Sequence, residues 1–143
     1  MIRKGRFHRY AESIQLVEQS CRPGTRVYDL GSATGNLAMA LCCRMPADAF
    51  EMVALDSSRP MLNIFKKRLS SAGRFAGITS MCRDLRRVNM ERAGVVVVNF
   101  TLQFIPPEDR DALIQRIYEA LVPGGRLLFS ETTRHPNQAL SDL

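Results

Sequence analysis

The chain has 143 residues, of which 45% are hydrophobic and 24% are charged, and this predicts one globular domain over 1–143. We expect no metal site, because the cysteines form no Cys-x-x-Cys pair and the two histidines lie near the ends of the chain. The longest apolar runs, 37–43 and 95–98, are too short to cross a membrane, and no signal peptide is recognisable, so we expect a cytoplasmic protein with free thiols. The net charge of +6 indicates a solvated basic surface; RNA contact is the alternative, although no aromatic residues interleave the arginine clusters.

Strand-like and helix-like segments alternate along the chain. An N-terminal helical segment is expected over 1–22, with its clearest apolar periodicity at 12–21, and a loose tail over 132–143. Strands are predicted at 26–30, 51–55, 78–82, 94–100 and 126–130, and helices at 36–44, 58–72 and 106–121. The unbroken run Val95–Val98 is typical of a strand buried on both faces. The alternation predicts an α/β fold with a parallel sheet and right-handed crossovers.

The most informative segment joins the first predicted strand to the helix that follows it, and its marked residues are Asp29, Gly31, Ser32, Ala33 and Gly35. A strand, a glycine-rich turn and a helix in this order allow the backbone to approach a nucleotide-like ligand. The dinucleotide fingerprint Gly-x-Gly-x-x-Gly does not fit, because Ala33 replaces the second glycine and asparagine the third. The pattern suits S-adenosylmethionine better, since this ligand has no pyrophosphate. A tight turn without a ligand is the alternative.

An acidic residue at the end of the second predicted strand strengthens this interpretation. Asp56 lies 25 positions after Gly31, and a carboxylate there can accept hydrogen bonds from ribose hydroxyls. The sequence therefore predicts a site for a nucleoside-containing cofactor.

A more specific segment runs from Asn99 through Phe104, with the sequence Asn-Phe-Thr-Leu-Gln-Phe. Two other stretches add to it, Pro23–Gly31 and a C-terminal one made of Ile117–Leu121, Pro123–Gly125 and Ser130–Glu131. With them the chain resembles the class I S-adenosylmethionine-dependent methyltransferases. Within them the chain is most similar to the carboxy-S-adenosyl-L-methionine synthases of the bacterial pathway that modifies the wobble uridine of tRNA. The resemblance covers roughly residues 10–131.

The resemblance implies a Rossmann-like sheet with about five parallel strands in the order 3-2-1-4-5 and flanking helices. The final antiparallel hairpin of the class I fold is expected to be missing, so the chain is similar to a family member truncated at its C-terminal end. The arginine that holds the new carboxylate in this family then has no counterpart here. A fifth strand at an open edge invites pairing with another chain, and a homodimer is one such arrangement.

The resemblance also implies a reaction and a set of site residues. The family converts S-adenosylmethionine and prephenate, a small carboxylate substrate, into carboxy-S-adenosylmethionine and phenylpyruvate. By similarity, Gly31, Ser32 and Ala33 line the methionine and ribose part of the cofactor. Asp56, with Ser57 beside it, is expected at the ribose hydroxyls, Asp84 and Leu85 at the adenine, and Asn99 at the reacting sulfonium as the catalytic residue.

Other interpretations of these residues remain open. Asp84 is also read as a surface charge beside neighbouring arginines, and Asn99 as a cap of its strand. Two functional alternatives stand beside the synthase. One is an ordinary methyltransferase acting on a small acceptor, and the other is a cofactor-binding or interaction module that has lost catalysis.

Overall fold

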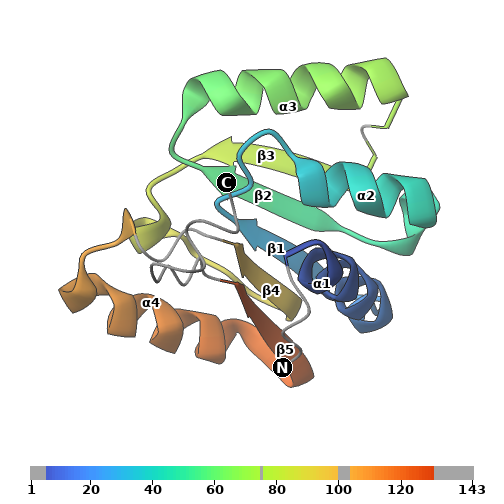
Figure 1. Ribbon diagram of the computed structural model, residues 1–143. Helices are drawn as coiled ribbons and strands as arrows, with labels where there is room; N and C mark the ends of the chain where they lie inside the picture. Colours follow the sequence, from blue (N-terminus) through green and yellow to red (C-terminus); the bar gives the residue numbers. More distant parts are fainter. Residues whose placement is uncertain (1–5, 75, 100–103, 131–143) are drawn as a thin grey trace.

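The computed structural model describes residues 6–74, 76–99 and 104–130, and Figure 1 shows how its elements are arranged. The strands are β1 (Arg26–Leu30), β2 (Met52–Asp56), β3 (Ile78–Cys82), β4 (Ala93–Asn99) and β5 (Leu121–Ser130). The helices are α1 (Arg6–Ser20), α2 (Asn36–Arg44), α3 (Arg59–Ala72) and α4 (Pro107–Ala120), with short 3₁₀ turns η1 (Ala47–Ala49) and η2 (Leu85–Arg87).

The strands form one parallel sheet in the order β3-β2-β1-β4-β5. This confirms the predicted α/β fold and its strand order. Helices α1, α2 and α3 cover one face of the sheet and α4 covers the other (Figure 1). Each crossover therefore places its helix where the apolar stripe of that helix meets a buried face.

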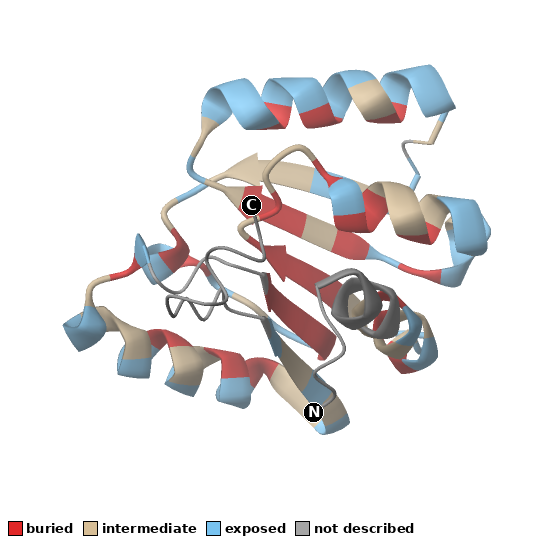
Figure 2. Cartoon of the chain, in the orientation of Figure 1, coloured by how far each residue is buried: buried red, intermediate tan, exposed pale blue. Residues whose placement is uncertain are grey.

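Strand β4 lies inside the sheet, and Val95–Val98 are all buried, as the sequence predicted (Figure 2). Val95 and Val97 belong to the core beneath α1, α2 and α3. Val96 and Val98 belong to the core beneath α4. The alternation follows from the two-residue period of a strand, and it explains why no polar residue interrupts this run.

Several element boundaries differ from the prediction. Helix α1 already begins at Arg6, and β4 begins one residue early, at Ala93. The largest difference is at β5, because residues 121–125 belong to the strand, although the preceding helix was expected to reach 121 and the strand to begin only at 126. Leu121 pairs with Ala93, and the register then shifts before Arg126 pairs with Val95, so an irregular strand accommodates the Pro-Gly-Gly sequence. Position 100 and the tail 132–143 lie outside the described residues.

Within residues 6–74, 76–99 and 104–130, no helix is long and apolar enough to cross a bilayer.

Candidate cofactor-binding site

The candidate site lies at the edge where the parallel strands end. The last residues of β1, β2 and β4 are Leu30, Asp56 and Asn99. Parallel strands bring these ends to the same side of the sheet, which is where open α/β sheets bind ligands. The glycine loop of residues 31–35 leaves β1 at this edge and leads directly into α2.

Two carboxylates meet on one face of the sheet at this edge. Asp29 pairs in register with Ala54 of β2 and Val97 of β4. Asp56 lies two residues beyond Ala54, so both aspartates project toward the side covered by α1, α2 and α3. A pair of carboxyl groups therefore lies next to the glycine loop.

The backbone of the glycine loop is held mainly by the neighbouring strand. The amides of Gly31 and Ser32 both donate to the carbonyl of Leu55, at 2.8 and 2.9 Å. The amide of Ala33 donates to Asp56 Oδ2 at 2.8 Å, and that of Gly35 donates to the carbonyl of Ser32 at 2.9 Å. In this conformation the four amides are already paired. We therefore expect a ligand to pack closely against the backbone of the loop, which small residues permit, rather than to receive hydrogen bonds from these four amides.

Left-handed backbone conformations shape the loop. Gly31, Ala33 and Gly35 have φ angles of 85°, 51° and 88°. Glycine adopts this region without strain, but a residue with a Cβ, such as Ala33, does so at a cost of roughly 1 kcal/mol. A Cβ on Gly35 would lie only 2.2 Å from the ring of Phe65. Glycine at 35 is therefore required by both its φ angle and its packing.

Asp29 is the most perturbed acid of the site. Its side chain is buried, with 2% of the residue exposed. Burial, followed by the negative charge of Asp56, raises the pKa of Asp29 to about 7. Its Oδ1 and the buried Oγ of Ser32 have no hydrogen-bond partner among the described residues. Unpaired buried polar atoms are rare, and here two of them occur at the edge where a ligand is expected.

Asp56 connects β2 to the glycine loop. Its Oδ1 accepts from the amide of Ser58 and its Oδ2 from that of Ala33, both at 2.8 Å. Each carboxylate oxygen has two lone pairs, so both retain room for a further donor such as a ribose hydroxyl. Ser57, the neighbour named with Asp56, is exposed. The position of Asp56 fits the predicted ribose role, which stays a prediction.

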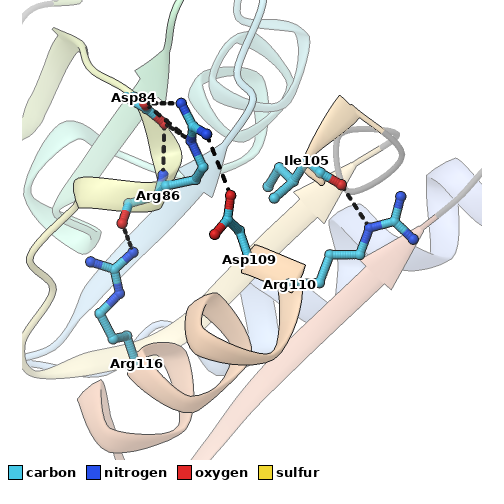
Figure 3. A network of polar contacts seen from close by, with 6 residues as sticks. All are labelled: Asp84, Arg86, Ile105, Asp109, Arg110 and Arg116. Atoms are coloured by element: carbon cyan, nitrogen blue, oxygen red, sulfur yellow. Dashed lines mark hydrogen bonds and ion pairs between the residues drawn. The ribbon is translucent and has the colours of Figure 1, made fainter. Parts of the chain in front are cut away.

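Asp84 lies in the network drawn in Figure 3. Its Oδ2 accepts from Nη2 of Arg86 at 2.7 Å, and its Oδ1 accepts from Nε of the same arginine at 3.0 Å. Hydrogen bonding from the Arg86 side chain is the main cause that lowers the pKa of Asp84 to about 2. Arg86 also reaches Asp109 of α4 at 3.4 Å, so η2 is tied to that helix. The adenine amine would have to share Asp84 with Arg86.

The same network extends along α4. Arg116 donates to the carbonyl of Arg86, and Arg110 donates to the carbonyl of Ile105 at 2.8 Å (Figure 3). Leu85, predicted at the adenine together with Asp84, is buried in the core beneath α4. The contacts of Arg116 and Leu85 fix η2 against α4 and keep the backbone next to Asp84 in place.

The remaining predicted residue, Asn99, ends β4 and pairs in register with Ser130. Its side chain lies outside the described part of the structure, and its catalytic role stays a prediction. Sequence analysis missed two residues of α3, Phe65 and Arg68, which contact the glycine loop. Phe65 and Arg68 are three positions apart and therefore lie on one face of the helix. This spacing is the sequence signal that could have pointed to them.

Comparison with known proteins adds the family. Residues 27–125 match the family described as a methyltransferase domain, which is more than half of the chain. The chain belongs to the methyltransferase domain family. Its curated relatives include carboxy-S-adenosyl-L-methionine synthases. That of Trichlorobacter lovleyi is 45% identical over 117 residues, which cover 81% of this chain and 48% of the relative.

A second synthase, from Shewanella denitrificans, is 36% identical over 121 residues, covering 85% of this chain and 50% of the relative. The chain thus spans about half the length of the curated relatives that it matches. Among solved structures, an S-adenosylmethionine-dependent methyltransferase from Clostridium acetobutylicum has a TM-score of 0.70 at 19% identity, covering 88% of this chain and 50% of that protein. At this identity the similarity establishes the fold.

Proposed function

We propose that this methyltransferase-family chain binds S-adenosyl-L-methionine and is a carboxy-S-adenosyl-L-methionine synthase. The observation that carries the proposal is the pair Asp29 and Asp56 beside the glycine loop, at the carboxyl edge of the sheet. The synthase relatives support the choice of enzyme, since they match more than four fifths of the chain.

The residues present fit the chemistry of this cofactor. S-adenosylmethionine carries two cationic groups, a sulfonium and an ammonium, as well as two ribose hydroxyls. Asp29 offers a buried oxygen that has no partner within the described part of the chain and is suited to a cation or a polar hydrogen. Asp56 offers lone pairs to the hydroxyls. Ala33 has only a methyl side chain and Gly35 has none, so the ligand can pass close to the backbone of the loop.

When bound, the cofactor supplies a one-carbon group activated by the sulfonium. The protein contributes position and electrostatics. Asp29 and Asp56 would orient the two ends of the methionine and ribose part, Asp84 with Leu85 would hold the adenine, and Asn99 would face the reacting centre. No general base is needed among these residues, because catalysis would rest on orientation and on preorganised charge.

Prephenate is the carboxylate substrate of the proposal, and carboxy-S-adenosylmethionine, phenylpyruvate and water are its products. The product would serve tRNA wobble-uridine modification in the cytoplasm. Free cysteines at 21, 42, 43 and 82 suit that reducing compartment. β5 forms one edge of the described sheet, and pairing of two copies there is part of the proposal.

The test begins with the small molecule that copurifies with the chain from a bacterial host. The protein is denatured and the released compound is weighed by mass spectrometry. The mass of carboxy-S-adenosylmethionine supports the synthase, and turnover of prephenate with S-adenosylmethionine then completes the test. Plain S-adenosylmethionine or its homocysteine product, without prephenate turnover, points to an ordinary methyltransferase. Neither binding nor turnover points to a module without catalysis.

A further inference from the structure

We propose that Arg68 of α3 is a positioning residue that holds the glycine loop in the shape that accepts the cofactor. This inference rests on the proposed binding of S-adenosylmethionine. Arg68 lies 34 positions from Thr34 in the sequence, but its Nη1 donates to the carbonyl of Thr34 at 3.0 Å. The same nitrogen donates to Oδ1 of Asn36 at 2.8 Å. Arg68 therefore bridges the two residues that flank Gly35.

The loop has need of such a support. Gly35 is the N-cap of α2 and has no side chain with which to cap the helix. Its left-handed backbone is one of several that a flexible glycine can adopt. Phe65, one turn before Arg68 on α3, fills the space beside the α-carbon of Gly35. Arg68 and Phe65 thus restrain the loop from the helix side.

The opposite side of the loop is restrained by β2. Asp56 Oδ2 accepts the amide of Ala33 at 2.8 Å, two residues before Gly35. The loop is therefore held between a carboxylate at the end of β2 and a guanidinium on α3. The carboxylate is expected to bind the ligand as well, whereas Arg68 acts only through the loop. Loss of Arg68 leaves the contacts of Asp56 in place, which makes its contribution separable.

The positive charge of Arg68 allows two explanations of its role to be distinguished by the direction in which the affinity for S-adenosylmethionine changes. S-adenosylmethionine has a net positive charge, so a nearby cation opposes its binding. If Arg68 acted only through its charge, neutralising it would strengthen binding. If Arg68 positions the loop, neutralising it weakens binding, because the backbone that meets the ligand is no longer fixed. The direction of the change therefore distinguishes the two explanations.

The experiment compares Arg68→Met with Lys67→Met by titration calorimetry using S-adenosylmethionine. Lys67 is exposed, neighbours Arg68 on α3 and loses the same charge when substituted. We expect Arg68→Met to weaken binding by about tenfold, the effect of losing roughly one charge-assisted hydrogen bond. Lys67→Met should bind as the parent chain does or slightly more tightly. Arg68→Lys, which keeps a donor, should recover part of the loss.

A second measurement does not depend on the ligand. Amide hydrogen exchange at residues 32–36 should be faster in Arg68→Met than in the parent chain and in Lys67→Met. If Arg68→Met proves poorly folded, Asn36→Ala removes only one side of the bridge and should give the same changes at smaller size. Unchanged or tighter binding of Arg68→Met, together with unchanged loop exchange, overturns the inference. A parent chain that binds no S-adenosylmethionine overturns the proposed function, and loop exchange still decides the role of Arg68.

Discussion

Replacing Asp29 with asparagine should change the stability of the chain in a way that depends on pH. The substitution keeps the size of the side chain and removes its ability to ionise. Asp29 is buried, and burial together with Asp56 raises its pKa in the folded chain from 3.8 to about 7. Without ligand, its ionised form is therefore a destabilising feature of the folded state.

The size of the effect follows from the two pKa values. In the unfolded chain Asp29 ionises near its ordinary value of 3.8, whereas in the folded chain it keeps its proton up to about 7. Between these values the folded state binds more protons than the unfolded state, so the free energy of unfolding decreases as the pH rises. Since one pH unit corresponds to about 1.4 kcal/mol, the full window accounts for at most about 4 kcal/mol.

The assay is urea unfolding of the parent chain and Asp29→Asn in the absence of ligand, from about pH 4 to about pH 8. The difference between the two chains cancels the other titrating groups. Asp29→Asn should gain stability relative to the parent as the pH rises, reaching about 2–4 kcal/mol at the upper end. Asp48→Asn, at an exposed aspartate of η1, serves as the control for removal of a surface carboxylate.

A stability difference that stays constant over this range would refute the reasoning, because it would mean that Asp29 titrates alike in both states. A relative stability of Asp29→Asn that decreases as the pH rises would refute the reasoning more strongly. The proposed cofactor adds a second expectation. A bound cation favours the ionised form of Asp29, so the variant that stabilises the free chain should bind S-adenosylmethionine more weakly at about pH 8.

Two further predictions are tested by thermal or urea unfolding, one on the packing of the glycine loop and one on the hydrogen bonds of Tyr28, whose side chain lies in the core beneath α4. Gly35→Ala should cost about 2–4 kcal/mol, because its Cβ would meet the ring of Phe65 at 2.2 Å. Gly24→Ala, at a similar φ of 79° but with nothing within 4 Å, should cost only about 1 kcal/mol, and equal losses would contradict the packing argument. Tyr28→Phe should cost about 1–2 kcal/mol, because the buried hydroxyl accepts from the amide of Glu91 at 3.1 Å and donates to its carbonyl at 3.2 Å. If Tyr28→Phe leaves the free energy of unfolding unchanged, these two hydrogen bonds make no net contribution to stability.

The sequence by itself determined the elements and their order. Apolar periodicity and the turn residues placed the strands and helices, apart from the first half of β5, and the valine run of β4 indicated a strand buried on both faces. The pattern of Asp29, Gly31, Ala33 and Gly35 and the acid at position 56 predict a ligand at the carboxyl edge of the sheet. These features are readable because they depend on short-range backbone preferences and on the period of buried residues.

Only the tertiary structure decided how the site is held and charged. The residues that fix the glycine loop include Leu55 and Asp56 of β2 and Arg68 of α3, and the sequence did not predict their hydrogen bonds to the loop backbone. The high pKa of Asp29 likewise arises from its depth in the sheet and from the charge of Asp56 on the next strand. Such contacts form when crossovers bring distant segments together, and their energies depend on burial and separation in space, which the order of residues along the chain does not encode locally.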